Sequence, residues 1–152
     1  MMPESRSIAL QLAQRFVEYK DRIDDVAAQV RRHKRILDLC PVPMFLTDEH
    51  GKCVYVNPAK LKLVGGTLDE MQYDGWQHFV YPEDLPHLLN AWTQFVQDHN
   101  QHTFSYTYRY QRPDGSALAV VTEARMLDDH SIVGFVLPLK CSGCFDFFTV
   151  HG

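Results

Sequence analysis

The chain has 152 residues, of which 45% are hydrophobic and 12% aromatic, and its formal net charge is −4. This composition excludes a mainly disordered chain, and no run approaches the roughly 18 uninterrupted apolar residues that a membrane span requires. Residues 1–40 carry eight Lys and Arg against six Asp and Glu, whereas the remainder carries seven against thirteen, so the globular part is acidic and a nucleic-acid surface there is not expected.

Residues 1–40 are predicted to form one long helix. A heptad pattern runs along it at alternating spacings of four and three, through Leu12, Phe16, Tyr19, Ile23, Val26, Val30, His33 and Leu37. A period of 3.5 residues sustained over several heptads is typical of a coiled coil. We therefore expect a homodimer, with a dimerisation seam made by Leu12, Phe16, Tyr19, Ile23, Val26 and Val30. The alternative is that the helix folds back on its own domain. Pro41 and Pro43 end the helix.

The region after these prolines changes to short strands and then to helical pieces. Met44–Asp48 and Cys53–Asn57 are predicted strands, and the turn between them contains Gly51. Residues 58–98 are expected to be helical in pieces. Thr67 with Glu70 forms a capping-box pattern, and Pro82-Glu83-Asp84 is expected to open a longer helix that runs to about Asp98.

The last third of the chain predicts three antiparallel strands. In Thr103–Arg112, four aromatic residues alternate with polar ones, which indicates a strand with one aromatic face. Turns at 113–115 and 128–129 separate it from predicted strands at Ala117–Met126 and Ser131–Leu137. The expected fold is α+β: a five-stranded antiparallel sheet with helices on one face, over residues 41–140, preceded by the long N-terminal helix and followed by a tail at 141–152.

Three short motifs follow one another between about Ile36 and Leu139. The first joins Thr47-Asp48 and Gly51 to the stretch 54–59, in which Asn57 precedes a helix. The second joins Gly75-Trp76 to the stretch 79–84. The third joins Tyr108-Arg109-Tyr110 to Asp114-Gly115-Ser116. In this order the three motifs resemble the PAS family, which usually has His where this chain has Tyr81.

The resemblance implies a sensory or regulatory module in signal transduction that is not an enzyme. PAS domains hold a cofactor, a small ligand or a partner helix between sheet and helices. A ligand of this chain is then expected near Trp76, Phe79, Leu89, Trp92, Tyr106 and Tyr108, where aromatic walls suit a flat or amphipathic small molecule. The cofactor is unknown and the signalling partner is unidentified. The alternative is a protein-protein interaction module whose core is filled by its own side chains.

The sequence gives little support for a flavin, haem or zinc site or for a catalytic motif. The stretch Met71–His78 has no cysteine of the kind that the flavin-binding subgroup uses, and His87 is offset by one residue from the haem-ligand position. Cys141 and Cys144 form a single C-x-x-C, which is weak evidence for zinc, so no metal site is predicted. No catalytic motif is present.

The ends of the chain suggest where it acts and how it signals. Residues 1–12 lack the features of a secretory signal, so a cytoplasmic location without membrane attachment is expected. PAS domains often end in an Asp-Ile-Thr motif that leads into a connecting helix, and here that place reads Pro138-Leu139-Lys140. We therefore expect the signal to leave through the N-terminal helix, across the stiff joint Pro41-Val42-Pro43.

Overall fold

The computed structural model describes residues 2–139, although the side chains of residues 2–6, 23, 25–27 and 30 lie outside the description. Two compact units divide at Leu39 and Cys40, and each is described by itself. The predicted tail, with Cys141 and Cys144, lies outside the described residues. No helix in the described part of the chain is long and apolar enough to cross a membrane.

The first unit contains the helix α1, Met2–Leu39, which confirms the predicted long helix. Three residues of the predicted seam have described side chains, and each is strongly exposed: Leu12 at 60%, Phe16 at 68% and Tyr19 at 63%. The side chains of Ile23, Val26 and Val30 are among those not described. The coiled coil itself stays a prediction, because a single chain is described.

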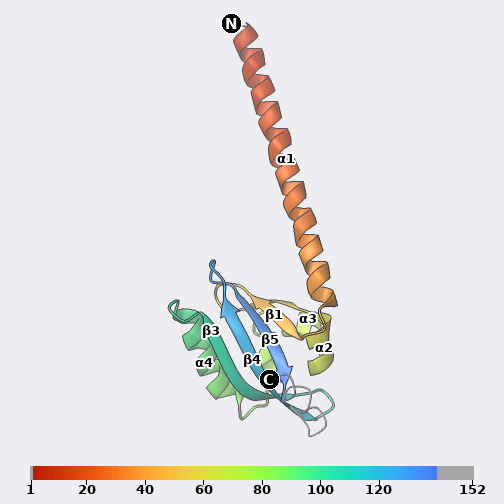
Figure 1. The fold of residues 1–152 in the computed structure, drawn as a ribbon, viewed down its shortest axis with the longest axis vertical. Helices are drawn as coiled ribbons and strands as arrows, with labels where there is room; N and C mark the ends of the chain where they lie inside the picture. The colour runs from red at the N-terminus through yellow and green to blue at the C-terminus, as the bar shows by residue number, and fades with distance from the viewer. Residues whose placement is uncertain (1, 140–152) are drawn as a thin grey trace, which may run out of the picture. The chain divides into compact units, whose positions relative to one another are not determined.

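The second unit is a five-stranded antiparallel sheet with helices, as predicted (Figure 1). Its elements are β1 (Met44–Thr47), β2 (Cys53–Val56), α2 (Pro58–Val64), α3 (Leu68–Met71), the 3-10 helix η1 (Gly75–Phe79), α4 (Leu85–Gln97), β3 (Thr103–Gln111), β4 (Ala117–Met126) and β5 (Ile132–Pro138). The strand order is β2-β1-β5-β4-β3, and every neighbouring pair is antiparallel. The first and last strands of the sequence, β1 and β5, therefore lie side by side in the middle.

Local capping explains where the helical pieces begin. Thr67 and Glu70 form the predicted capping box at α3. Asn57 caps α2, because its side-chain oxygen accepts a hydrogen bond from the backbone N–H of Lys60 at 3.0 Å. The helix expected to open at Pro82 begins instead at Leu85, because the N–H of Asp84 closes a turn onto the carbonyl of Tyr81 at 2.9 Å.

The hydrophobic core lies between the sheet and the helices α2, α3, η1 and α4. Its most completely buried side chains are Tyr110, Phe95, Met71, Ile132, Val64, Val120, Val136 and Asn57. The aromatic face predicted for Thr103–Arg112 points into this core, since Phe104, Tyr108 and Tyr110 are all buried. Burial of large aromatic groups stabilises the fold by on the order of 2 kcal/mol each, and it also builds the walls of the site described below.

Candidate functional site

A small cavity of about 30 Å³ lies inside the second unit, between the sheet and the helices. Its lining comes from nearly every element of the fold: Phe45, Thr47, Gly51, Cys53, Lys60, Trp76, Leu88, Trp92, Phe104, Tyr108, Tyr110 and Thr122. A water molecule needs roughly 10–15 Å³ of cavity volume measured in this way, so the cavity has room for about two waters or a very small molecule.

Trp92 organises the aromatic wall of the cavity. Its ring packs edge-on against Phe45, with centroids 6.1 Å apart, and against Phe104 at 5.2 Å. Its indole N–H donates to the carbonyl of Gly51 at 3.4 Å, which holds the β1-β2 turn against α4. Gly51 has φ +76°, and a side chain there would also collide with Val96. The wall is therefore interlocked rather than loosely packed.

Three buried hydroxyl groups form a chain along the sheet side of the cavity. The Tyr108 hydroxyl lies 2.9 Å from the hydroxyl of Tyr110 and 2.8 Å from that of Thr122. Burial raises the pKa of both tyrosines, so they remain neutral phenols at physiological pH. Three hydroxyls carry three protons, and the two hydrogen bonds among them use two. One O–H donor is therefore left for another acceptor.

Lys60 lies on the inner face of α2, one turn before the buried Val64. The lysine is only 4% exposed, and its ammonium lies 4.5 Å from the ring centre of Phe45 and 5.9 Å from that of Tyr110. Among residues 2–139, no hydrogen bond or ion pair of this ammonium is present. Burial lowers the pKa of Lys60 from 10.5 to about 8, and the neighbouring Cys53 acts in the opposite direction with a smaller effect.

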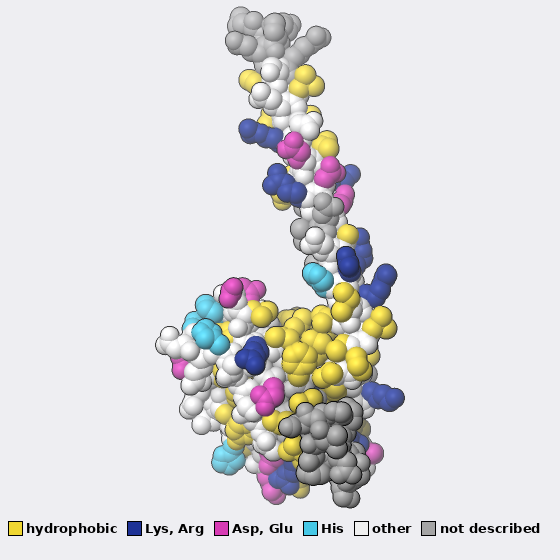
Figure 2. All heavy atoms as spheres, in the orientation of Figure 1, with side chains coloured by type: hydrophobic (Ala, Val, Ile, Leu, Met, Phe, Trp, Pro, Cys, Tyr) yellow, Lys and Arg dark blue, Asp and Glu magenta, His cyan; other side chains and the backbone are white. Residues whose placement is uncertain are grey.

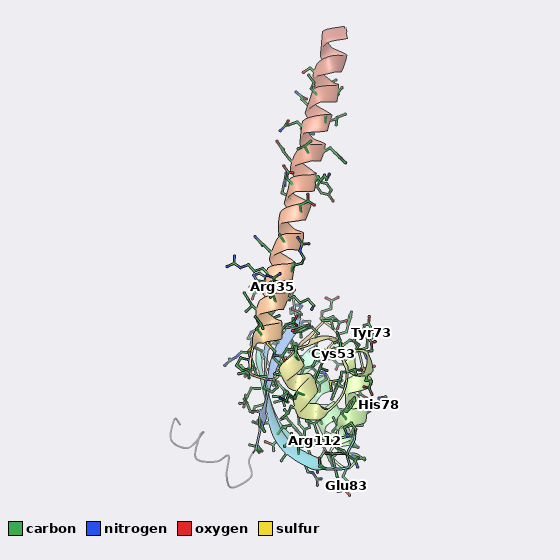
Figure 3. The ribbon with its side chains drawn as sticks, turned by 90° about the vertical axis from the view of Figure 1, so that its right-hand side faces the viewer. Arg35, Cys53, Tyr73, His78, Glu83 and Arg112 are labelled. Atoms are coloured by element: carbon green, nitrogen blue, oxygen red, sulfur yellow. The ribbon has the colours of Figure 1, made fainter. Side chains whose placement is uncertain are left out.

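Cys53, labelled in Figure 3, is the other titratable group beside Lys60. The thiol is buried on β2, and burial raises its pKa although the Lys60 charge acts in the opposite direction. It is therefore a neutral thiol at pH 7 and does not compensate the lysine charge. The cavity thus combines a buried cation with neutral hydrogen-bond donors.

The six residues predicted to surround a ligand fall in four places. Trp76, Trp92 and Tyr108 line the cavity. Phe79 is buried in the core but does not line it. Leu89 lines a surface hollow near the β1-β2 turn, and Tyr106 lines a groove between α4 and β3. Whether any of the six binds a ligand stays a prediction.

Sequence reasoning missed Lys60, the most unusual residue of the site. In the run Pro58-Ala-Lys-Leu-Lys-Leu-Val, Lys60 and Lys62 look alike, and only the spacing of four between Lys60 and the apolar Val64 distinguishes them. The structure buries Lys60 and exposes Lys62. Other lining residues, such as Phe45 and Thr122, lie on strands. The alternation of side chains along a strand predicts which face is buried, but it does not predict that these residues line a cavity.

An ion pair joins the second and third motifs of the sequence. The Asp84 carboxylate accepts from the backbone N–H of Arg109 at 2.9 Å, from its Nε at 3.0 Å and from its Nη2 at 2.9 Å. These hydrogen bonds hold the pKa of Asp84 below its usual value. The guanidinium also stacks 4.0 Å from the centre of the Tyr81 ring. This contact ties the start of α4 to β3 beside the cavity.

Other candidate ligand sites lack support within the described residues. His87 on α4 is exposed. Residues 2–139 contain no group of three or more His, Cys, Asp or Glu side chains able to hold a metal ion. The C-x-x-C pair lies in the part of the chain that is not described.

The opposite face of the sheet carries a second feature, an apolar surface. Figure 2 shows hydrophobic side chains gathered over the region of β1 and β5. Cross-strand partners on this face are only half-buried: Leu46 pairs with Tyr55 and Val133, and Leu137 pairs with Val121. We call Leu46, Tyr55, Val121, Val133, Phe135 and Leu137 the outer apolar face.

The sheet order, the helices on one side and the small cavity between them define an α+β domain with a cavity between sheet and helices. A sequence profile of the PAS fold matches residues 53–136, more than half of the chain. The chain belongs to the PAS fold family, as its motifs suggested. No curated protein matches it.

Solved structures show the same fold at low sequence identity. The PAS domain of an HTR-like protein from Haloarcula marismortui is 15% identical, with a TM-score of 0.60, over 79% of this chain and 99% of that one. A domain of a sensory box sensor histidine kinase/response regulator from Geobacter sulfurreducens is 20% identical, with a TM-score of 0.59, over 74% and 96%. The LOV protein of Rhodobacter sphaeroides is 15% identical, with a TM-score of 0.58, over 76% and 70%.

Proposed function

We propose that this chain is a cytoplasmic sensory module that binds a small ligand in its cavity and passes the signal through α1. The observation that carries the proposal is the cavity lined by a buried cation that has no ion-pair partner among residues 2–139, because such a group is costly unless something else requires it. The similar sensor histidine kinase domain supports a signalling role. Membership of the PAS fold family supports a regulatory role rather than catalysis.

A route from the cavity to α1 runs through Asn57. Lys60 lines the cavity and stands one turn after Asn57 at the start of α2. The Asn57 side chain is fully buried and donates to the carbonyls of Val42, at 2.8 Å, and Cys40, at 3.4 Å. Its oxygen also accepts from the N–H of Met44 at 2.9 Å. One side chain therefore fixes the joint that follows α1, so a shift of α2 would move the joint.

Hydrogen exchange tests this route. Ligand binding is expected to change exchange rates along α1 in the wild-type chain, and Asn57→Ala is expected to abolish that change while leaving ligand binding intact. Native mass spectrometry of both proteins establishes whether the ligand is bound. An α1 response that survives in Asn57→Ala would overturn the route, and a bound ligand without any α1 response would overturn the proposed function.

The second part of the proposal is that α1 forms a homodimeric coiled coil. Exposed apolar residues at seam positions support it, since large apolar groups on an isolated helix are stabilised by a partner. Ile23→Asp with Val30→Asp places two carboxylates in the predicted seam, at a cost on the order of 2 kcal/mol or more each. We expect this double variant to be monomeric by light scattering, at 17.6 kDa, whereas the native chain has twice that mass.

A matched control adds the same charge outside the seam. Gln14 and Ala28 fall on the opposite side of the heptad pattern, and both are exposed. Gln14→Asp with Ala28→Asp should therefore remain dimeric. A monomeric native chain, or a seam variant that stays dimeric, would show that α1 does not dimerise in this way.

A second candidate function is a protein-protein interaction module with a self-filled core. The small volume of the cavity and the outer apolar face favour it, because half-buried apolar side chains on neighbouring strands suit a partner surface. Native mass spectrometry separates the two candidates. Added mass on the purified chain supports sensing. Partner binding that is lost in Val133→Asp but unchanged in Lys60→Met supports interaction.

A further inference from the structure

The ammonium of Lys60 is a buried cation with no carboxylate or hydrogen-bond partner among residues 2–139. A buried cation is normally paired with a carboxylate, because removal from water disfavours the charge. Here its neighbours are the faces of Phe45 and Tyr110, which attract a cation but cannot accept its three hydrogen bonds. The N–H groups of the ammonium are therefore available to an acceptor at the cavity wall.

The remaining polar groups of the cavity add to this excess of donors. The hydroxyl chain of Tyr108, Tyr110 and Thr122 has one proton left after its internal bonds. The neutral thiol of Cys53 carries no charge that could pair with Lys60. Among the described residues, no Asp or Glu lines the cavity, and its other residues are mainly aromatic or aliphatic. A complementary ligand must bring acceptors and a negative charge.

The geometry points to a small monocarboxylate as the ligand, with its carboxylate bound by the ammonium of Lys60 and the hydroxyl chain. This inference rests on the proposed function and names its ligand class. The volume of about 30 Å³ limits the ligand to a few heavy atoms, so formate and acetate fit the space better than propionate, which has five. The aromatic wall built by Phe45, Trp92 and Phe104 then encloses the short apolar end.

Titration calorimetry with formate, acetate and propionate tests the inference, with acetamide as the neutral counterpart of acetate. We expect at least one carboxylate to bind and acetamide to bind at least about tenfold more weakly, because it lacks the charge that pairs with Lys60. Lys60→Met keeps an unbranched apolar side chain of nearly the same length but has no ammonium, so it should remove carboxylate binding. Lys62→Met, an exposed lysine on the same helix, should bind as the native chain does.

Proton linkage gives a second readout that a merely structural lysine would not show. Since Lys60 loses its proton above a pKa of about 8, acetate affinity should fall about tenfold per pH unit above that value in the native chain and in Lys62→Met. Folding of Lys60→Met is checked by circular dichroism. Absence of saturable binding by all three carboxylates, equal affinity for acetate and acetamide, or undiminished binding by folded Lys60→Met would each overturn the inference.

These outcomes are distinguishable from failure of the proposed function. If a different, neutral molecule co-purifies with the native chain and alters hydrogen exchange in α1, sensing stands and the carboxylate assignment falls. If acetate binds through Lys60 but α1 does not respond, the ligand class stands and the proposed signalling function falls.

Discussion

Gly134→Ala is expected to lower the free energy of unfolding by about 3 kcal/mol, because it overpacks the core beside the cavity. Gly134 is buried on β5 and lies directly across from Phe45 on β1. A methyl group at position 134 would collide with the ring of Phe45. That ring cannot move aside freely, since the edge of Trp92 and the ammonium of Lys60 both pack against it. Urea denaturation measures the change.

A double-mutant cycle isolates the contact with the ring. Phe45→Leu removes the ring and should itself destabilise the core, but it also makes room for the new methyl group. Adding Gly134→Ala to Phe45→Leu should therefore cost much less than adding it to the native chain. Additive losses would mean that strain at Gly134 does not come from the Phe45 ring.

Lys60→Met is expected to raise the free energy of unfolding at pH 7, by an amount that disappears at high pH. A lowering of the pKa from 10.5 to about 8 corresponds to about 3 kcal/mol of destabilisation of the charged form. Contacts of the ammonium with Phe45 and Tyr110 offset part of the total cost, while methionine fills the same space without a charge.

The direction of the pH dependence follows from proton counting. Between pH 8 and 10.5 the unfolded chain binds the Lys60 proton and the folded chain does not, so the stability of the native chain rises with pH across this window. Below pH 8 both states are protonated and the full cost remains. The stability difference between Lys60→Met and the native chain should therefore be constant below pH 8 and shrink towards pH 10.5.

Other titrating groups near Lys60 are shared by both proteins. Cys53, Tyr108 and Tyr110 face the same cavity with raised pKa values. In Lys60→Met the pKa of Cys53 rises further, because the lysine charge that lowers it is gone. Lys62→Met is the control and should leave stability nearly unchanged at every pH, because that lysine is exposed. A Lys60→Met variant that is less stable than the native chain at pH 7, or a difference independent of pH, would contradict this account.

Local sequence patterns were sufficient for the elements of the fold. The alternation in Thr103–Gln111 predicts β3 and its buried aromatic face, because a strand turns successive side chains to opposite sides whatever lies beyond them. The capping box of Thr67 and Glu70 and the cap at Asn57 are likewise local, because each partner is within three residues. The family resemblance followed from motifs that these local signals place in order.

The site depended on contacts that no local pattern encodes. Trp76, Trp92 and Tyr108 were predicted near a ligand and do line the cavity, whereas Leu89 and Tyr106 lie at other surfaces. Asp84 pairs with Arg109, which is far from it in the sequence. Neither motif by itself predicts this pairing.

Lys60 shows most clearly the difference between what the sequence determines and what the tertiary structure decides. The sequence by itself determined a short helix after Asn57 with two lysines, and both were equally suited to solvent. Only the packing of α2 against the sheet decided that Lys60 faces Phe45 and Tyr110 while Lys62 stays outside. The physical reason is that helix formation depends on neighbours within one turn, whereas the burial of a charge depends on which distant side chains surround it.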